Sequence, residues 1–163
     1  MSDPITLHPV AVVRSPRKEP RDDYWGEVEA SVELDAERFD AEALAGLEAF
    51  SHLEVVYYFH SVPDAKVRTG ARRPRNREDW PRVGIFAQRA KGRPNRVGVS
   101  RCRLVAVEGT RLRVMDLDAI DGTPVIDIKP YVAEMGPIGA THQPPWITEL
   151  MQDYYTPSSD DPR

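Results

Sequence analysis

The chain has 163 residues, of which 40% are hydrophobic and 29% charged, as is typical of one soluble globular domain. No apolar run approaches the roughly 20 residues of a membrane span, and the N-terminus lacks the basic and apolar segments of a secretion signal. Cys102 is the only cysteine, which excludes an intrachain disulfide. These features predict a cytoplasmic protein with no membrane contact.

The net charge of −4 conceals a strong asymmetry along the chain. Residues 66–103 contain 13 Lys and Arg against two acids, whereas the remainder contains 9 basic and 24 acidic residues. Such a block predicts a polyanionic partner, and RNA is the obvious one. The alternative is that these arginines face solvent and pair with the protein's own acids.

The first part of the chain predicts short strands and one helix. Residues 7–14 form a β-type run, and residues 25–34 alternate apolar with polar side chains, as in a half-buried strand. Residues 40–50 predict a short helix with Asp40 as its N-cap. Residues 53–60 are rich in β-branched and aromatic side chains and predict a strand.

The rest of the chain predicts more strands between loops. Residues 61–81 contain too many Pro, Arg and Asn for regular structure and predict a long loop. A strand is expected at 82–87, then a hairpin of residues 97–109 and 110–118 that turns near Gly109.

The C-terminal part begins with a strand at 124–131, whose Ile126 and Ile128 are expected to share one face. A short helix is predicted within residues 145–155, and the residues from 156 onward are expected to be frayed.

Seven or so short strands with one short helix and long loops predict an all-β (mainly β) fold, either a barrel or a sandwich. We expect a single domain over residues 1–163, with its core at about 8–132 and a C-terminal tail at 133–163. No additional C-terminal domain is expected.

Several standard sites lack support in the sequence. No GxGxxG follows a strand, and neither a phosphate-binding P-loop nor a GxSxG nucleophile motif occurs. The four histidines lack metal-ligand spacing, and Cys102 has no cysteine partner. A dinucleotide site, a serine hydrolase and a metal centre are therefore not expected.

Two polar loops remain as candidates for the functional site. Residues 89–100, RAKGRPNRVGVS, combine glycines that allow close backbone approach with arginines that match phosphate or carboxylate groups. Residues 117–131, LDAIDGTPVIDIKPY, place three carboxylates around a Gly-containing turn. Taken alone, either loop could equally be a surface turn with solvated charges, with Asp121 capping its own turn.

Five segments in the same order resemble one known family. They are VAVVRSP (10–16), GLEAFSHL (46–53), RVGIFAQR (82–89), RPNRVGVS (93–100) and LDAIDGTPVIDIKPY (117–131). The sequence resembles the TsaA-like (YaeB, or TrmO) family of S-adenosylmethionine-dependent methyltransferases. The resemblance implies a small single-sheeted β-barrel that forms a homodimer and binds S-adenosylmethionine. It also implies methylation of the exocyclic amine of threonylcarbamoyl-adenosine beside the tRNA anticodon.

The resemblance assigns roles to the two loops. Asp121 and His60 are the candidates for the weak base that takes the proton of the amine, although a histidine that ends an apolar strand is more often a core residue. The residues expected to contact the cofactor are Phe86, Ala87, Gln88, Arg89, Arg93, Asn95, Ser100, Leu117, Asp118, Ile120, Asp121, Gly122, Thr123 and Pro124.

Positive charge and aromatic rings near the loops are expected to meet tRNA. Trp80 has two interpretations: it stacks on an exposed base, or it anchors its own loop. The residues expected to contact tRNA are Arg72, Arg73, Arg75, Arg77, Lys129 and Tyr131.

Two other function classes remain open at this stage. The chain could bind S-adenosylmethionine as a sensor or partner protein without using it. It could also methylate a small metabolite or another RNA.

Overall fold

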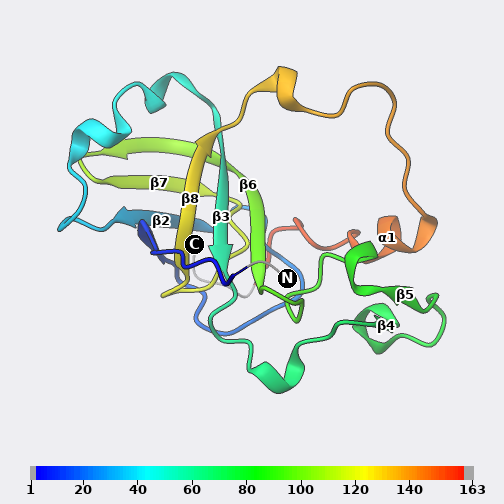
Figure 1. Cartoon of the computed structure of the whole chain (residues 1–163). Coiled ribbons are helices and arrows are strands. Elements are labelled where there is room, and N and C mark those ends of the chain that lie inside the picture. The colour runs from blue at the N-terminus through cyan, green and yellow to red at the C-terminus, as the bar shows by residue number, and fades with distance from the viewer. Residues whose placement is uncertain (1–2, 160–163) are drawn as a thin grey trace.

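Six antiparallel strands close into a barrel in the computed structural model, which describes residues 3–159 (Figure 1). Around the barrel their order is β1 (Ala11–Arg14), β2 (Glu29–Leu34), β7 (Arg111–Met115), β6 (Val97–Glu108), β3 (His52–Tyr58) and β8 (Pro124–Pro130). The ring is closed by β1 and β8, where Ala11 lies opposite Val125. The prediction of a mainly β, single-sheeted barrel is confirmed.

The barrel is filled by the alternate side chains of its strands. In β3, Leu53, Val55 and Tyr57 point inward and are buried, and the residues between them are only partly buried. Leu112 and Val114 of β7 contribute in the same way. Because successive side chains of a strand point to opposite faces, this alternation gives each strand one apolar face for a common core.

The strand β8 departs from the expected alternation at a bulge. Val56 of β3 lies opposite Asp127, whereas Tyr57 lies opposite Val125, so Ile126 is the extra residue. A bulge shifts the pattern by one position, which allows both Val125 and Ile128 to face the core. The expectation that Ile126 and Ile128 share one face is therefore wrong.

The predicted helix at 40–50 is two short 3₁₀ turns. These are η1 (Ala41–Leu44) and η2 (Leu47–Ala49), and they are separated by Gly46, whose φ is +85°. A residue with positive φ interrupts a right-handed helix, and glycine adopts this conformation without a steric penalty. Asp40 caps η1 as expected, because its Oδ1 accepts a hydrogen bond from the Glu42 N–H at 3.0 Å.

The predicted strand at 82–87 is mostly a turn and lies outside the barrel. Only β5 (Val83–Gly84) is extended, and it pairs with β4 (Ala71–Arg72) in a separate two-stranded sheet. It is followed by the 3₁₀ turn η5 (Ile85–Ala87). The predicted loop at 61–81 also contains two 3₁₀ turns, η3 (Asp64–Lys66) and η4 (Pro74–Asn76).

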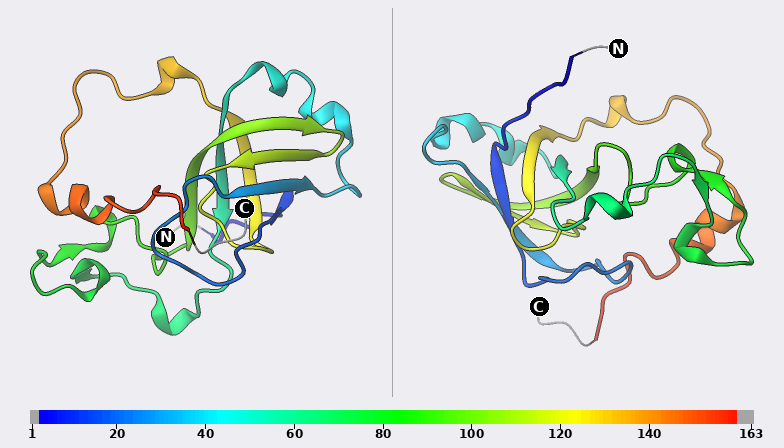
Figure 2. Two further views of the ribbon diagram at one scale, coloured as in Figure 1. Left: turned by 180° about the vertical axis from the view of Figure 1, so that it is seen from behind. Right: turned by 60° about the horizontal axis from the view of Figure 1, so that its bottom comes forward.

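The chain after β8 leaves the barrel and returns. It passes through η6 (Ala133–Met135) and arches over to the predicted short helix, α1 (Pro145–Leu150), which lies beside the β4–β5 sheet (Figures 1 and 2). No helix of the described residues has the length and apolar character needed to cross a membrane.

The tail beyond α1 is held against the N-terminal part of the chain. The Tyr24 N–H donates to the Asp153 carbonyl at 3.0 Å, and the Trp25 N–H donates to the Tyr154 carbonyl at 2.8 Å. Gly26 forms a bridge with Pro157. The tail is therefore ordered as far as this bridge, so fraying from residue 156 is wrong there; residues 160–163 lie outside the described part.

Candidate functional site

The Asp118 side chain connects the second predicted loop to the barrel and to the C-terminal tail. Its Oδ1 accepts a hydrogen bond from the Tyr57 hydroxyl at 3.1 Å, and its Oδ2 accepts one from the Tyr154 hydroxyl. Burial and then the negative charge of Asp118 raise the pKa of both tyrosines above the ordinary value. The two phenols therefore stay protonated and hold the carboxylate from two sides.

The turn after Asp118 is fixed to β1 by main-chain groups. The Ser15 N–H donates to Asp121 Oδ1 at 3.1 Å, and the Gly122 N–H donates to the Val13 carbonyl at 2.8 Å. Gly122 has a φ of +77°, which suits glycine. Asp121 thus has a structural role, but it differs from the expected capping of its own turn, since its oxygen satisfies a backbone donor beyond the end of β1.

His60 follows β3 and lies beside the same turn. Its Nε2 is 3.9 Å from the position that a Cβ on Gly122 would occupy. The His60 side chain is exposed, so the interpretation as a core histidine is wrong. The structure therefore brings together the two residues predicted as the base, Asp121 and His60, at one turn.

The first predicted loop begins at a buried amide. Gln88 is only 6% exposed, and its Nε2 donates to the carbonyls of Arg72 and Val83 at 3.2 and 2.8 Å. These two acceptors fix the orientation of the amide, so Oε1 is left as a buried acceptor without a donor. Arg93 reaches back to the same residue and donates to its carbonyl at 2.9 Å.

The tail brings the two predicted loops to one surface. Arg89 donates to the Val99 carbonyl at 2.8 Å. Burial and then Asp118 raise the pKa of Tyr155 to about 12, whereas Arg89 and the nearby Ser100 hydroxyl act in the opposite direction. A charged group shifts the pKa of another group mainly when the two lie close together. The two loops themselves meet at Tyr57, which binds Asp118 and whose ring lies against Gly98 of the first loop.

The predicted cofactor residues differ in how accessible they are. Ser100, Leu117 and Thr123 are buried and support the loops from inside, whereas Phe86 is 79% exposed. Ala87 and Asn95 are exposed, and Ile120 and Pro124 are half-buried. A separate depression of about 300 Å³ on the outside of the barrel is formed by none of these residues; its lining is Glu27, Glu29, Arg103 and Met115.

Sequence reasoning missed the aromatic residues of this surface. Tyr57 was assigned only to a strand, and Tyr154 and Tyr155 fall at the end of the predicted tail helix. The only signal for the tail is the pair of adjacent tyrosines in an otherwise polar segment. No local pattern shows that this pair meets Asp118, because the contact depends on the return of the chain after α1.

Much of the basic block forms ion pairs within the protein. The Arg75 guanidinium binds both carboxylate oxygens of Asp23, at 2.7 and 2.8 Å. Arg77 pairs with Asp79 and with Glu149, the latter at 3.0 Å. The alternative that these arginines pair with the protein's own acids thus holds for part of the block.

The interpretation of Trp80 as an anchor is confirmed. Its side chain is 3% exposed, and its Nε1 donates to Glu149 Oε2 at 2.9 Å. The ring lies 6.3 Å from that of Trp146, centroid to centroid, which ties α1 to the β4–β5 sheet. A buried ring has no free face for a base, so the stacking alternative is wrong.

The predicted tRNA residues of β8 lie away from the arginines of the β4–β5 sheet. The Lys129 ammonium pairs with Asp127 at 2.6 Å, and the Tyr131 N–H bonds to the His52 carbonyl, where β3 begins. Asp118 meets Tyr57, which lies near the other end of β3. The structure therefore does not bring the predicted tRNA residues together.

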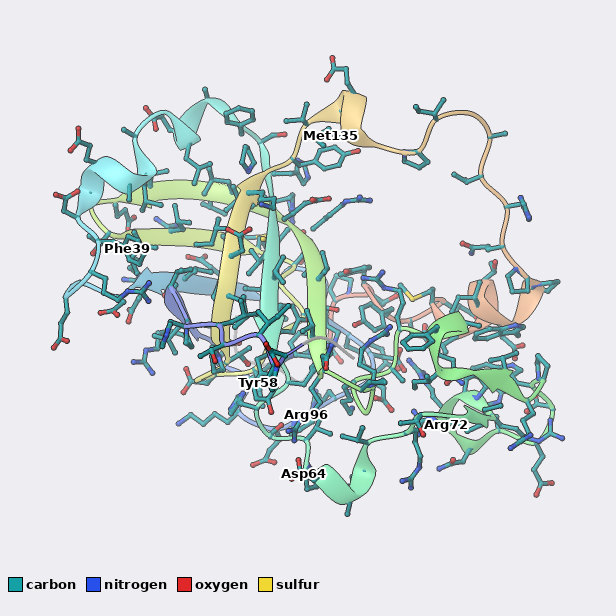
Figure 3. The ribbon with its side chains drawn as sticks, in the orientation of Figure 1. Phe39, Tyr58, Asp64, Arg72, Arg96 and Met135 are labelled. Carbon is teal, nitrogen blue, oxygen red and sulfur yellow. The ribbon has the colours of Figure 1, made fainter. Side chains whose placement is uncertain are left out.

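Arg96 is used to fix the first loop. It donates to the Val62 carbonyl at 2.6 Å, pairs with Asp64 at 2.8 Å and lies over the Tyr58 ring. Figure 3 shows Tyr58, Arg96 and Asp64 one after the other at the end of β3. Within residues 3–159, no group of three or more His, Cys, Asp or Glu side chains is arranged to hold a metal ion.

Residues 12–136 match the family model described as the tRNA-methyltransferase O N-terminal domain. This match covers most of the chain. The chain belongs to the tRNA-methyltransferase O N-terminal domain family.

The relatives of this domain include proteins of different lengths. A probable S-adenosyl-L-methionine-binding protein of Methanothermobacter thermautotrophicus is 40% identical over 144 residues, covering 85% of this chain and 99% of that one. The tRNA (adenine(37)-N6)-methyltransferase of Escherichia coli is 40% identical over 134 residues, covering 76% of this chain and 56% of that one.

The fold of the domain matches solved structures of TrmO. A crystal structure of TrmO from Pseudomonas aeruginosa superposes with a TM-score of 0.72 and 29% identity, covering 90% of this chain. The superposition covers 63% of that chain, so the present chain spans less than two thirds of the solved protein.

Proposed function

We propose that the protein is an S-adenosylmethionine-dependent methyltransferase that acts on tRNA, at the exocyclic N6 amine of the adenine beside the anticodon. The acceptor is threonylcarbamoyl-adenosine. The observation that carries the proposal is the 40% identity with the Escherichia coli tRNA (adenine(37)-N6)-methyltransferase over 134 residues, which cover 76% of this chain.

The polar groups of the two loops fit S-adenosylmethionine. Gln88 Oε1 is a buried acceptor without a donor, and the half-buried Asp118 carboxylate, held by Tyr57 and Tyr154, is a fixed negative charge beside the loops. A ligand with hydroxyl groups and an ammonium supplies such donors. The full set of proposed cofactor residues is the one expected from the sequence, with Ser100, Leu117 and Thr123 supporting it from beneath.

Bound S-adenosylmethionine supplies a methyl group that transfers in one in-line displacement. The protein therefore has to orient the acceptor amine, exclude water and accept one proton. His60 is exposed beside Gly122 and is the better base of the two, because Asp121 Oδ1 already binds the Ser15 N–H. A weak base is sufficient for this proton.

We propose that the phosphates of tRNA bind the basic side of the β4–β5 sheet, with Arg72, Arg73, Arg75 and Arg77; Lys129 and Tyr131 lie away from this sheet and are not part of this proposed surface. Arg72 Nε is a buried donor without an acceptor, which supports an anion site there. Replacing Arg72, Arg73 and Arg75 together by Ala should weaken RNA binding and flatten its dependence on salt.

The matched control for this variant removes three arginines from the outer face of the barrel, namely Arg14, Arg103 and Arg113. It has the same net charge, so a difference between the two variants reports position. Equal RNA affinity of both variants at low and high salt would contradict the proposed surface.

Two further properties belong to the same proposal. A homodimer is supported by the exposed apolar side chains Phe86, Met135 and Ile138, the last of which is 100% exposed. Sedimentation or light scattering measures it directly. We also propose a cytoplasmic location, which the proposed action on tRNA supports.

A second candidate is a protein that binds S-adenosylmethionine without transferring its methyl group. It is favoured by the archaeal relative of almost the same length, which is described only as a probable binding protein.

The decisive experiment measures both activities on the same preparation. Calorimetry with S-adenosylmethionine tests binding, and transfer of a labelled methyl group to tRNA carrying threonylcarbamoyl-adenosine tests catalysis. Mass spectrometry of tRNA from a deletion strain should show loss of that methyl group. Binding without transfer and without loss in the strain would favour the second candidate.

A further inference from the structure

An exposed aromatic ring lies where the two candidate loops meet. Tyr155 is 44% exposed, and its ring meets the ring of Tyr154, whose hydroxyl binds Asp118 of the second loop. Arg89 binds the carbonyl of Val99, whose side chain is 42% exposed. Exposed aromatic rings supply the stacking surfaces of nucleotide-binding sites, so a ring held beside the second loop is a candidate ligand contact.

The chain holds this ring in one place. Tyr154, the preceding residue, is fixed through its hydroxyl to Asp118, and the two tyrosine rings meet edge to face at 5.0 Å. The backbone of the tail is bonded to Tyr24 and Trp25. An aromatic ring with so little freedom loses little entropy when it binds a ligand.

Gly26 lies directly against the backbone of the tail at Tyr155. A Cβ at that position would lie 1.9 Å from the Tyr155 carbonyl oxygen, a distance no side chain tolerates. Glycine therefore permits the backbone approach that brings Tyr155 to the loops. The tail is therefore a fixed part of the surface that the two candidate loops form.

We propose that Tyr155 is a binding residue whose exposed ring face stacks on an adenine ring, with Arg89 at the polar edge of that base. The inference rests on the proposed function, since both the methyl donor and the acceptor nucleotide carry adenine. Every purine offers a flat π-face, and aromatic side chains in nucleic-acid sites bind bases in this way.

The test compares Tyr155→Ala, Tyr155→Phe and the matched control Phe50→Ala. Phe50 is an exposed aromatic residue before the first residue of β3, whereas the site is near the last. Calorimetry with S-adenosylmethionine and fluorescence titration with an anticodon stem-loop RNA give the two affinities. Circular dichroism and urea unfolding confirm that each variant is folded.

Tyr155→Ala should weaken one of the two affinities by about 10-fold, the size expected for the loss of one base–aromatic stack. Tyr155→Phe keeps the ring and should bind like the wild type, as should Phe50→Ala. A loss with S-adenosylmethionine assigns the adenine to the methyl donor, and a loss with RNA alone assigns it to the acceptor.

Two outcomes overturn the inference, and they are distinguishable. If the wild type binds S-adenosylmethionine and RNA but Tyr155→Ala binds both equally well or more tightly, the inference fails and the proposed function stands. If the wild type binds neither, the proposed function fails and the inference falls with it.

Discussion

The carboxylate of Asp118 accepts hydrogen bonds from Tyr57 in β3 and from Tyr154 in the C-terminal tail. One side chain thus joins the barrel wall, the turn at Gly122 and a segment that returns from the far side of the β4–β5 sheet. Together with the backbone bonds of Tyr24 and Trp25, this carboxylate fixes where the tail lies.

Removing the Tyr154 hydroxyl should destabilise the protein. Tyr154→Phe keeps the ring but leaves one oxygen of a partly buried carboxylate without its donor, so we expect the free energy of unfolding to fall by about 1.5–3 kcal/mol. Urea unfolding measures this change. The control Tyr24→Phe alters an exposed tyrosine, and its effect should be within about 0.5 kcal/mol. Equal effects of the two variants would refute the role of Asp118.

The protein should lose stability in alkaline solution. Burial, followed by the charge of Asp118, raises the pKa of Tyr57 and Tyr154 in the folded state above the value of about 10 found in unfolded chains. A raised pKa in the folded state means that the stabilisation is complete below pH of about 10 and declines as the pH rises toward the folded pKa values.

Urea unfolding at a series of pH values from roughly 9 to roughly 11.5 measures this decline, because the series spans the ordinary phenol pKa of about 10. Tyr57→Phe removes one of the two phenols and should make the decline shallower. A steeper or unchanged decline in this variant would show that other groups cause it.

The single cysteine should be unreactive in the folded protein. Cys102 is buried, and burial, followed by the charge of Asp118, raises the pKa of its thiol to about 12. Since only the thiolate reacts with iodoacetamide, mass spectrometry should find no adduct at neutral pH in the native state and a complete adduct in urea. Rapid labelling of the native protein would contradict the burial.

A methyl group at position 26 should release the tail. In Gly26→Ala the new Cβ would lie 1.9 Å from the Tyr155 carbonyl oxygen. Because this oxygen belongs to the main chain, it can move away only if the tail backbone moves with it. We expect the Trp25 amide, which donates to the tail, to exchange its hydrogen faster. Gly70→Ala is the control, because its Cβ would have no atom within 4 Å. Similar exchange in both variants would mean that the tail does not depend on this contact.

The sequence predicted those features of the fold that depend on local pattern. The strand predicted at 53–60 from its β-branched and aromatic residues and the turn at Gly109 depend on a few residues each, and both are confirmed. The bulge at Ile126 was missed because it depends on the register between two strands that are distant in the chain. The helix predicted at 40–50 is interrupted at Gly46, whose φ is positive. The sequence shows that a glycine is present but not which φ it adopts.

For the candidate site, the sequence supplied the loops but not their neighbours. Asp118 and Arg89 were identified, yet nothing nearby in the sequence indicates that Tyr154 and Tyr155 lie between them. The contacts of Arg75 and Arg77 were also beyond the sequence, since their partners Asp23 and Glu149 come from opposite ends of the chain. Charge composition predicts a basic block but not which of its members are already neutralised.

The closure of the barrel by β1 and β8 restricts how two copies of this protein can associate. Each barrel strand has a neighbour on both sides, so the barrel presents no free edge that could extend into a continuous intermolecular sheet. Among the strands of residues 3–159, the short β4 and β5 form the sheet with open edges. Two copies must therefore recognise each other through side chains or through this small hairpin, and a charged substitution at the contact should be enough to separate them.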